Sequence, residues 1–335
     1  MKDMARLTRC STLALLLGPL IGCTAAPEQD PRVELIADSP SFNELIAANP
    51  RVESITTDAV WAEGPVCLAD GRLIWSDVKR NSVMSWKEGQ DVQTWLAKSD
   101  FQNGHALDHD GRVIAASHGQ RAIVRREAGG RWRVLVDRYQ GKRLNSPNDV
   151  VVAADGGIWF SDPTFGLFNE KEGYGGTQEQ DGEYVYRYDP LTNSLTRMAT
   201  PEVHAPNGLA FSPDGDRLYI ADSQQAHDFN DESLAHHIVV YDVKDNALSG
   251  ARVFAEISPG IPDGIKVDEN GNVWSSSKEG LQVFSPQGER LGMIRVASSD
   301  TGNLTFCSTD DQHWLYITAA NQVLRIASKV GGAGR

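Results

Sequence analysis

Six acidic or amide side chains recur along the chain in one local setting, and each carries a side-chain oxygen. They are Glu63, Asn103, Asn148, Asn207, Asp263 and Asn303, and we call them the anchors. Each precedes a short apolar stretch and then a turn, as Asn148 precedes Val150–Val152 and the turn at Asp155-Gly156. Hard cations prefer such oxygen ligands, and no thiol or imidazole is among them. Converging anchors would hold one divalent metal, with calcium favoured over zinc, magnesium or manganese.

A second interpretation of the anchors is purely structural. Asn and Asp before Gly shape turns through local hydrogen bonds, so six similar turns would show the same residue types. This alternative stays open for Asn103 and Asn303. It fits Glu63 poorly because glutamate is an unfavourable turn residue. Without a cation, Glu63 and Asp263 packed around one axis would also repel each other.

The elements that must position the anchors are strands in a sixfold repeat. An Asp-Gly or Asn-Gly pair between two apolar runs predicts a β-hairpin. The second run is rich in aromatic and branched residues, as in Ile158-Trp159-Phe160. A third strand follows in each repeat and a fourth in most, and repeats of about 40–60 residues are typical of propeller blades. The sequence therefore predicts an all-β, six-bladed β-propeller over residues 51–330, with a metal site on its central axis.

The ends of the repeat array predict how the ring closes. The sixth repeat has only three strands, and Val52–Thr56 has strand character, so we expect this segment to supply the missing outer strand. Strand direction alternates within a blade, which places all anchors on one face together with long insertions at residues 163–182 and 223–235. Cys67 and Cys307 fall on inner strands of the first and last blades; a disulfide and two free thiols both remain open.

The start of the chain carries targeting features. Basic residues precede an apolar run from Leu13 to Ile21 that is too short to span a bilayer, which predicts a signal peptide over residues 1–22. The residues up to Cys23 resemble a bacterial lipobox, so we expect a lipidated Cys23 and a linker over residues 23–50. Ordinary cleavage a few residues later is the alternative. The protein is thus expected to be exported to the periplasm and held at the membrane only by a lipid anchor.

Composition excludes some classes of function and partner. The net charge is −13, and no basic patch indicates nucleic-acid binding. No GxSxG motif supports serine catalysis, and no CxxC motif with paired histidines supports a structural zinc site. We expect a small-molecule partner and a monomer or weak homo-oligomer.

Four short motifs, in order along the chain, resemble the senescence-marker-protein, gluconolactonase and luciferin-regenerating-enzyme family of calcium-dependent propellers. They are Glu63-Gly64-Pro65, Ser146-Pro147-Asn148-Asp149, Pro206-Asn207-Gly208-Leu209 and Pro262-Asp263-Gly264. The similarity covers about residues 55–327. The stretch from Arg143 to Val150 is especially similar to the bacterial gluconolactonase branch.

The resemblance implies a role for each matching residue. The metal ligands would be Glu63, Asn148, Asn207 and Asp263, and Asp263 would also be the catalytic acid/base. The substrate contacts would be Asn103, His118 and Asn148. The family often has Glu before this histidine, whereas Ser117 stands here, which leaves the identity of the substrate open. The choice between Asp263 and His118 as the base also stays open.

The implied activity is that of a metal-dependent hydrolase that opens a sugar lactone by polarising its carbonyl and activating water. One alternative is a phosphotriesterase-like or other ester hydrolase on the same site. Another is a non-catalytic calcium- or sugar-binding propeller of the cell envelope. Comparing the rates on lactones and on organophosphates distinguishes the lactonase from the phosphotriesterase-like hydrolase. If the metal-loaded protein turns over neither, the binding protein is favoured.

Overall fold

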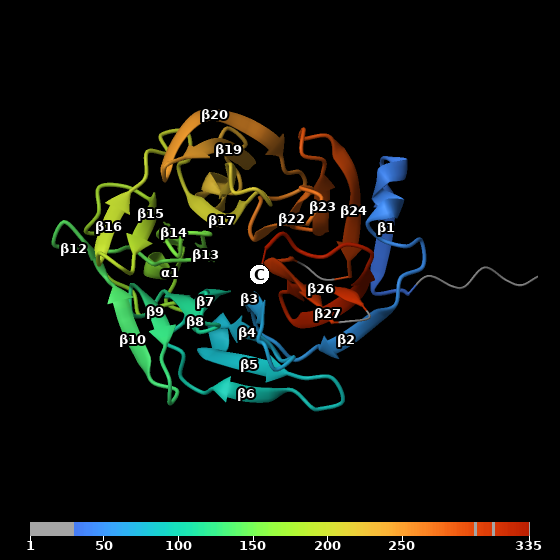
Figure 1. Ribbon diagram of the computed structural model, residues 1–335, viewed down its shortest axis with the longest axis horizontal. Coiled ribbons are helices and arrows are strands. Elements are labelled where there is room, and N and C mark those ends of the chain that lie inside the picture. Colours follow the sequence, from blue (N-terminus) through green and yellow to red (C-terminus); the bar gives the residue numbers. More distant parts are fainter. Residues whose placement is uncertain (1–29, 298–299, 310–311, 335) are drawn as a thin grey trace, which may run out of the picture.

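The computed structural model describes residues 30–297, 300–309 and 312–334. Six antiparallel sheets surround a central axis, so the protein is a six-bladed β-propeller (Figure 1). This arrangement confirms the predicted all-β fold. The predicted signal peptide and the lipidation site at Cys23 lie outside the described residues.

Four blades are built from consecutive strands, the first of each being innermost. Blade 1 comprises β3 (Ala62–Cys67), β4 (Leu73–Asp77), β5 (Ser82–Trp86) and β6 (Gln93–Leu96), and blade 2 comprises β7 (Gln102–Leu107), β8 (Val113–Ser117), β9 (Ala122–Arg126) and β10 (Trp132–Val136). Blade 3 comprises β13 (Val150–Val152), β14 (Ile158–Asp162), β15 (Tyr184–Asp189) and β16 (Ser194–Arg197), and blade 4 comprises β17 (Pro206–Phe211), β18 (Arg217–Asp222), β19 (His237–Lys244) and β20 (Ala247–Glu256).

The last two blades each recruit a strand from the start of the described chain. Blade 5 comprises β21 (Ile265–Val267), β22 (Val273–Ser277), β23 (Gly280–Phe284), β24 (Arg290–Val296) and the added β1 (Val33–Ala37), and blade 6 comprises β25 (Asn303–Ser308), β26 (His313–Ala319), β27 (Gln322–Ser328) and the added β2 (Val52–Thr56). The remaining elements are α1 (Phe165–Phe168), three short 3₁₀ helices, η1 (Pro40–Glu44), η2 (Val78–Arg80) and η3 (Gln224–His227), and the two-stranded β11 (Arg138–Tyr139) and β12 (Lys142–Arg143).

The hairpins between first and second strands depend on glycine. Gly71, Gly111, Gly156, Gly215 and Gly271 each follow the Asp or Asn of the turn and have φ values between 74° and 85°. This left-handed region is costly for residues that carry a Cβ. The Asp-Gly and Asn-Gly pairs in the sequence therefore mark, in five blades, the end that lies away from the anchors.

The hydrophobic core lies between adjacent blades. Separate buried clusters fill the interfaces from blade 1 with blade 2 round to blade 6 with blade 1. Trp75, Trp159 and Trp274, from the second strands of three blades, are fully buried in these layers. Because each blade buries both of its faces against its neighbours, the inner strands are held at fixed positions around the axis.

Ring closure follows the sequence-based prediction. Strand β2 pairs antiparallel with β27, with Val52 opposite Ile326. A disulfide joins Cys67 of β3 to Cys307 of β25, with their Cα atoms 6.1 Å apart. This resolves the choice that the sequence left open between a bond and free thiols, and it links the first blade to the last.

The predicted linker over residues 23–50 is corrected from Val33 onward. Strand β1 pairs with β24 as a fifth, outer strand of blade 5, with Val33 opposite Val296. Phe42, Leu45 and Ile46 are buried in the core between blades 5 and 6. Apolar side chains so placed stabilise the domain by their removal from water, so this segment is part of the propeller.

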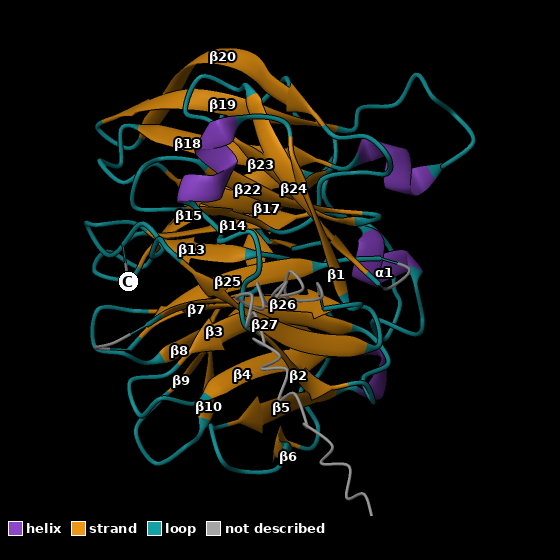
Figure 2. Ribbon diagram, turned by 90° about the vertical axis from the view of Figure 1, so that its right-hand side faces the viewer, coloured by secondary structure: helices purple, strands orange, loops and turns teal. Residues whose placement is uncertain are grey.

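The two long insertions lie at one face of the ring. They connect β14 to β15 and β18 to β19, and Figure 2 shows α1 to one side of the stacked strands. At the opposite face the chain ends with a bridge between Asp268 and Gly332, where the C-terminal residues meet the inner strand of blade 5. Within the described ranges, no helix is long and apolar enough to cross a membrane.

Candidate metal and active site

Each anchor lies within two residues of the start of one of the six innermost strands. Each innermost strand contacts the next around the ring, so the anchors gather at one end of the axis. Five anchors are almost fully buried, and Asp263 keeps part of its surface accessible. The structure thus brings together residues that are distant in sequence, as the repeat predicted.

Glycines beside the anchors allow this close approach. Backbone hydrogen bonds join neighbouring blades at Gly104 N to Asn148 O (2.8 Å), Gly208 N to Asp263 O (3.0 Å) and Gly264 N to Gly302 O (2.8 Å). A Cβ on Gly208 would overlap the Asp263 carbonyl, and one on Gly264 would overlap the Asn303 amide. The Gly of each Asn-Gly or Asp-Gly pair at the axis is therefore required by packing.

Glu63 and Asp263 lie close enough to affect each other's ionisation. Burial, followed by the charge of Asp263, raises the pKa of Glu63 well above its usual range. Burial raises the pKa of Asp263 to about 8, and the charge of Asp149 adds to this shift. A buried carboxylate without a compensating charge favours its protonated form. Ionised Glu63 and Asp263 would therefore bring negative charge to the site that the neighbouring side chains do not balance.

Two amide anchors hydrogen-bond these acids. Asn303 bonds the side chain of Glu63, and Asn207 bonds that of Asp263, and each bond lowers the pKa of its acid. The second oxygen of Asp149, next to Asn148, has no hydrogen-bond partner and lies 3.9 Å from Lys266 Nζ. Among the described residues, neither Glu63 nor Asp263 forms an ion pair with Lys or Arg.

This donor set fits a hard divalent cation. The described residues contain no group of three His, Cys, Asp or Glu side chains arranged to hold a metal. A metal on the axis would therefore need the amide oxygens of Asn148 and Asn207 beside the two carboxylates. Oxygen-only sets with few charges suit calcium, which completes its shell with water. The unpaired charge of Glu63 and Asp263 is the observation that favours such an ion.

His118 lies beside the anchor Asn103. The Asn103 amide nitrogen is 3.3 Å from His118 Nε2, and His118 Nδ1 is 3.0 Å from the carbonyl oxygen of Glu172. With the amide donating to Nε2, the ring proton must sit on Nδ1 and point to Glu172. Burial lowers the pKa of His118 to about 4, so the ring is neutral at physiological pH.

Sequence reasoning missed three residues near the anchors. His105, on β7, has Nδ1 2.8 Å from the Gly64 carbonyl oxygen and so fastens blade 2 to blade 1. Asp149 and Glu172 both add negative charge that raises the pKa of Asp263. The Asn148-Asp149 pair gave a signal for Asp149 in the sequence. Glu172 gave none, because its position depends on the folded path of the insertion.

The insertions over this face also contact each other. The rings of Phe165 and His227 have centroids 5.2 Å apart, and His227 Nε2 lies 3.0 Å from Glu183 Oε1. Glu183 also accepts a hydrogen bond of 2.7 Å from Thr164. The insertions of blades 3 and 4 thus support each other above the anchors.

Residues 61–321 match the family described as "SMP-30/Gluconolactonase/LRE-like region". A protein of Zymomonas mobilis named gluconolactonase is 31% identical over 320 residues, covering 88% of this chain and 86% of its own length. Pentonolactonase XacC of Haloferax volcanii is 27% identical over 277 residues, covering 79% and 84%.

A solved structure of a Xanthomonas campestris gluconolactonase superposes with a TM-score of 0.80 at 37% identity, covering 88% of this chain and 94% of that one. The luciferin-regenerating enzyme, at 18% identity and a TM-score of 0.66, shares the fold. The family match over residues 61–321 includes all six anchors. This chain belongs to the SMP-30/gluconolactonase/LRE-like family.

Proposed function

We propose that the protein is a lactonase of the gluconolactonase type that opens a sugar lactone with the help of one divalent metal. Three relatives that cover 79–88% of this chain are named gluconolactonase or pentonolactonase. The observation that carries the proposal is the meeting of Glu63 and Asp263 at the axis without a cationic partner among the described residues. The names of these relatives support hydrolysis of a lactone, and the gathering of acids and amides at the axis supports a bound metal.

Glu63, Asn148, Asn207 and Asp263 would hold the metal, as their placement around one end of the axis allows. A bound divalent cation would polarise the lactone carbonyl and stabilise the negative charge that develops on its oxygen. Calcium is the ion that the donor set favours, and zinc, magnesium and manganese are the alternatives to test.

Asp263 is the residue that we assign to proton transfer. Its carboxylate is oriented by Asn207 and keeps an accessible surface, so it can accept the proton of an attacking water. The water oxygen bonds to the carbonyl carbon, and the ring C–O bond then breaks. The proton passes to the departing alkoxide, and the product is an open-chain hydroxy acid that ionises in water.

Asn103 and His118 are assigned to substrate contact rather than to proton transfer. The Nε2 lone pair of His118 accepts from Asn103, so the ring fixes the direction of the amide. The Asn103 amide oxygen is thereby left to accept a hydrogen bond from a substrate hydroxyl. Asn148 adds a further amide at the same end of the axis.

We also propose that the protein works outside the cytoplasm, tethered through Cys23. The disulfide between Cys67 and Cys307 supports this location, because such bonds persist in oxidising compartments. Metabolic labelling with a fatty acid, followed by fractionation of wild type and Cys23→Ser, tests the anchor. Equal labelling of the two forms would exclude it.

The activity is tested by a pH-stat, since lactone opening releases acid. EDTA-treated protein is assayed on glucono-δ-lactone before and after addition of each of the four metals, with uncatalysed opening subtracted. We expect hydrolysis to need a metal and to be fastest with calcium. Turnover of organophosphates but of no lactone would exclude the lactonase, and no turnover of any ester by metal-loaded protein would leave a binding protein.

A further inference from the structure

An ion pair bridges two blades at the face that carries the anchors. Lys79 follows β4 of blade 1 in η2, and Glu172 belongs to the insertion of blade 3. Lys79 Nζ lies 3.4 Å from Glu172 Oε1, and the two side chains remain 26% and 16% exposed. Both groups are thus held in place while part of each stays accessible to a ligand.

Neighbouring residues fix each partner of this pair. Asn169 donates a hydrogen bond of 3.0 Å to Glu172 Oε1, and the Glu172 carbonyl accepts from His118 Nδ1 at 3.0 Å. Lys79 Nζ lies over the ring of Trp61, 3.9 Å from its centroid, which is cation–π geometry. Side chains held in this way lose little further freedom when a ligand binds.

The pair lies beside the site assigned to the reaction. His118 contacts Glu172 through one ring nitrogen and Asn103 through the other. The charge of Glu172 also reaches Asp263, where it raises the pKa of that carboxyl group. A substrate at the anchors would therefore have the carboxylate of Glu172 and the ammonium of Lys79 within its surroundings.

We propose that Lys79 and Glu172 form a subsite that recognises the hydroxyl groups of the lactone and so selects polyhydroxylated substrates. This proposal rests on the lactonase function. A hydroxyl group both donates and accepts, so a carboxylate can accept from it while an ammonium donates to a neighbouring one. A partly buried polar pair that must give up water for the substrate discriminates against lactones that lack these hydroxyls.

The test compares two lactones in Glu172→Gln and Lys79→Met. Glucono-δ-lactone carries the hydroxyls, and δ-valerolactone has the same ring without them. We expect kcat/KM for glucono-δ-lactone to fall by about tenfold or more, mainly through a higher KM. A fall of this size corresponds to the loss of one charged hydrogen bond. The value for δ-valerolactone should stay within about twofold, because that substrate makes no such bond.

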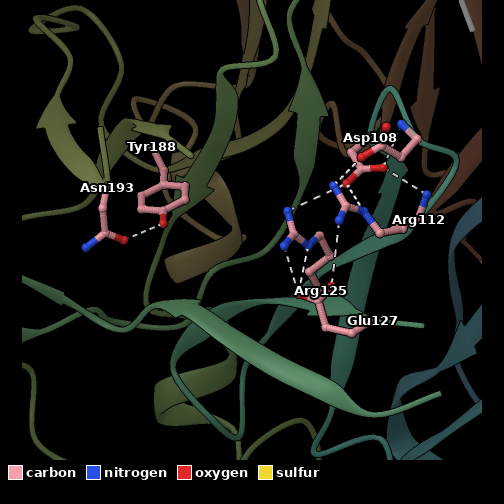
Figure 3. Close-up of polar contacts among 7 residues, drawn as sticks. Asp108, Arg112, Arg125, Glu127, Tyr188 and Asn193 are labelled. Atoms are coloured by element: carbon pink, nitrogen blue, oxygen red, sulfur yellow. Dashed lines mark hydrogen bonds and ion pairs between the residues drawn. The ribbon is translucent and has the colours of Figure 1, made fainter. Parts of the chain in front are cut away.

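Matched controls lie in the ion network of Figure 3, at the ends of the blade 2 strands that lie away from the anchors. Glu127 pairs with Arg125 at 2.8 Å, and Arg112 pairs with Asp108 at 2.8 Å. Glu127→Gln and Arg112→Met remove comparable charges far from the anchors and should leave both lactones unaffected. A fall for both lactones alike in the Lys79 and Glu172 variants, or for neither, would overturn the subsite.

A binding measurement separates this proposal from the reaction itself. Gluconolactam carries the same hydroxyls and is not hydrolysed, so calorimetry reports its affinity without turnover. We expect about tenfold weaker binding in Glu172→Gln than in wild type and Glu127→Gln. If Glu172→Gln weakens gluconolactam binding as expected but the wild type hydrolyses no lactone, only the proposed function is contradicted. If the variant binds gluconolactam with unchanged affinity and the wild type is an active lactonase, only the subsite is contradicted.

Discussion

Single residues at the axis carry the chemistry that we assign to this protein. Glu63 and Asp263 were predicted to meet, and the charge of Asp263 contributes to the raised pKa of Glu63. Their types and spacing were visible in the sequence because an oxygen recurs at the same point of each repeat. Glu172 was not predictable, since a long insertion has no period that would place its side chain.

Asp263→Asn is expected to lower kcat by at least about a hundredfold while leaving the fold intact, because the amide cannot accept the proton of water. Initial rates on glucono-δ-lactone and circular dichroism provide the measurement. Asp155→Asn serves as the control, because it also removes one carboxylate, which pairs with Arg187 at the end of blade 3 away from the anchors. Retained turnover in Asp263→Asn would move the proton transfer to another group.

Stability of the metal-free protein should fall as the pH rises from 6.5 to 8. Burial raises the pKa of both Asp263 and Asp162 to about 8, so the folded state holds protons that the unfolded state has lost. The burial-lowered pKa values of His105 and His118, about 4, act mainly below this range; just above 6.5 the unfolded rings still lose their remaining protons, which opposes the fall only weakly. Each retained proton is worth about 1.4 kcal/mol per pH unit at most.

Urea unfolding in EDTA at the two pH values measures this dependence. Asp263→Asn should show a smaller fall than wild type, whereas Asp155→Asn should match wild type. Excess calcium should reduce the fall as well, since a bound cation stabilises the ionised carboxylates. A wild-type protein that becomes more stable toward pH 8 would contradict the assignment of raised pKa values.

At the scale of elements, the insertion of blade 3 controls the surroundings of His118. A Cβ on Gly166 would overlap the Cγ of this ring, so glycine lets α1 pass directly over it. Gly166→Ala is therefore expected to displace the ring and, through Asn103, to reduce kcat/KM by about tenfold. A double-mutant cycle checks the route: in a His118→Ala background the same change should cost little. Equal losses in both backgrounds would show that Gly166 acts elsewhere.

Most of the strands that the sequence predicted have partners close in sequence, and the exception is the closing strand β2. Asp-Gly and Asn-Gly turns joined the inner strand to the next strand in five blades, and the short sixth repeat pointed to Val52–Thr56 as the closing strand. Strand β1 was missed because Val33–Ala37 has no neighbouring hairpin and pairs only with distant β24. Its residues Leu35, Ile36 and Ala37 are apolar in succession, so the segment lacks the alternation that would have marked a strand.

For the whole molecule, closure of the ring is what keeps the anchors together. The disulfide between Cys67 and Cys307 spans a sequence separation of 240 residues, so it restricts the unfolded chain strongly. Cys67→Ser with Cys307→Ser should lower the free energy of unfolding by about 3–5 kcal/mol, as long loops are costly to close. Urea midpoints of the double variant and wild type, both without reductant, provide the measurement. Equal midpoints would show that pairing of β2 with β27 is sufficient for closure.

The central claim is that one cation, held at the meeting point of the inner strands, enables lactone hydrolysis. The most direct measurement is a calcium titration of EDTA-treated wild type, with bound calcium and the rate of glucono-δ-lactone opening recorded on the same samples. The account predicts a rate that rises in proportion to bound calcium and levels off at one ion per chain, with both responses lost in Glu63→Gln. Full activity without a divalent metal, or full calcium binding without hydrolysis, would contradict it.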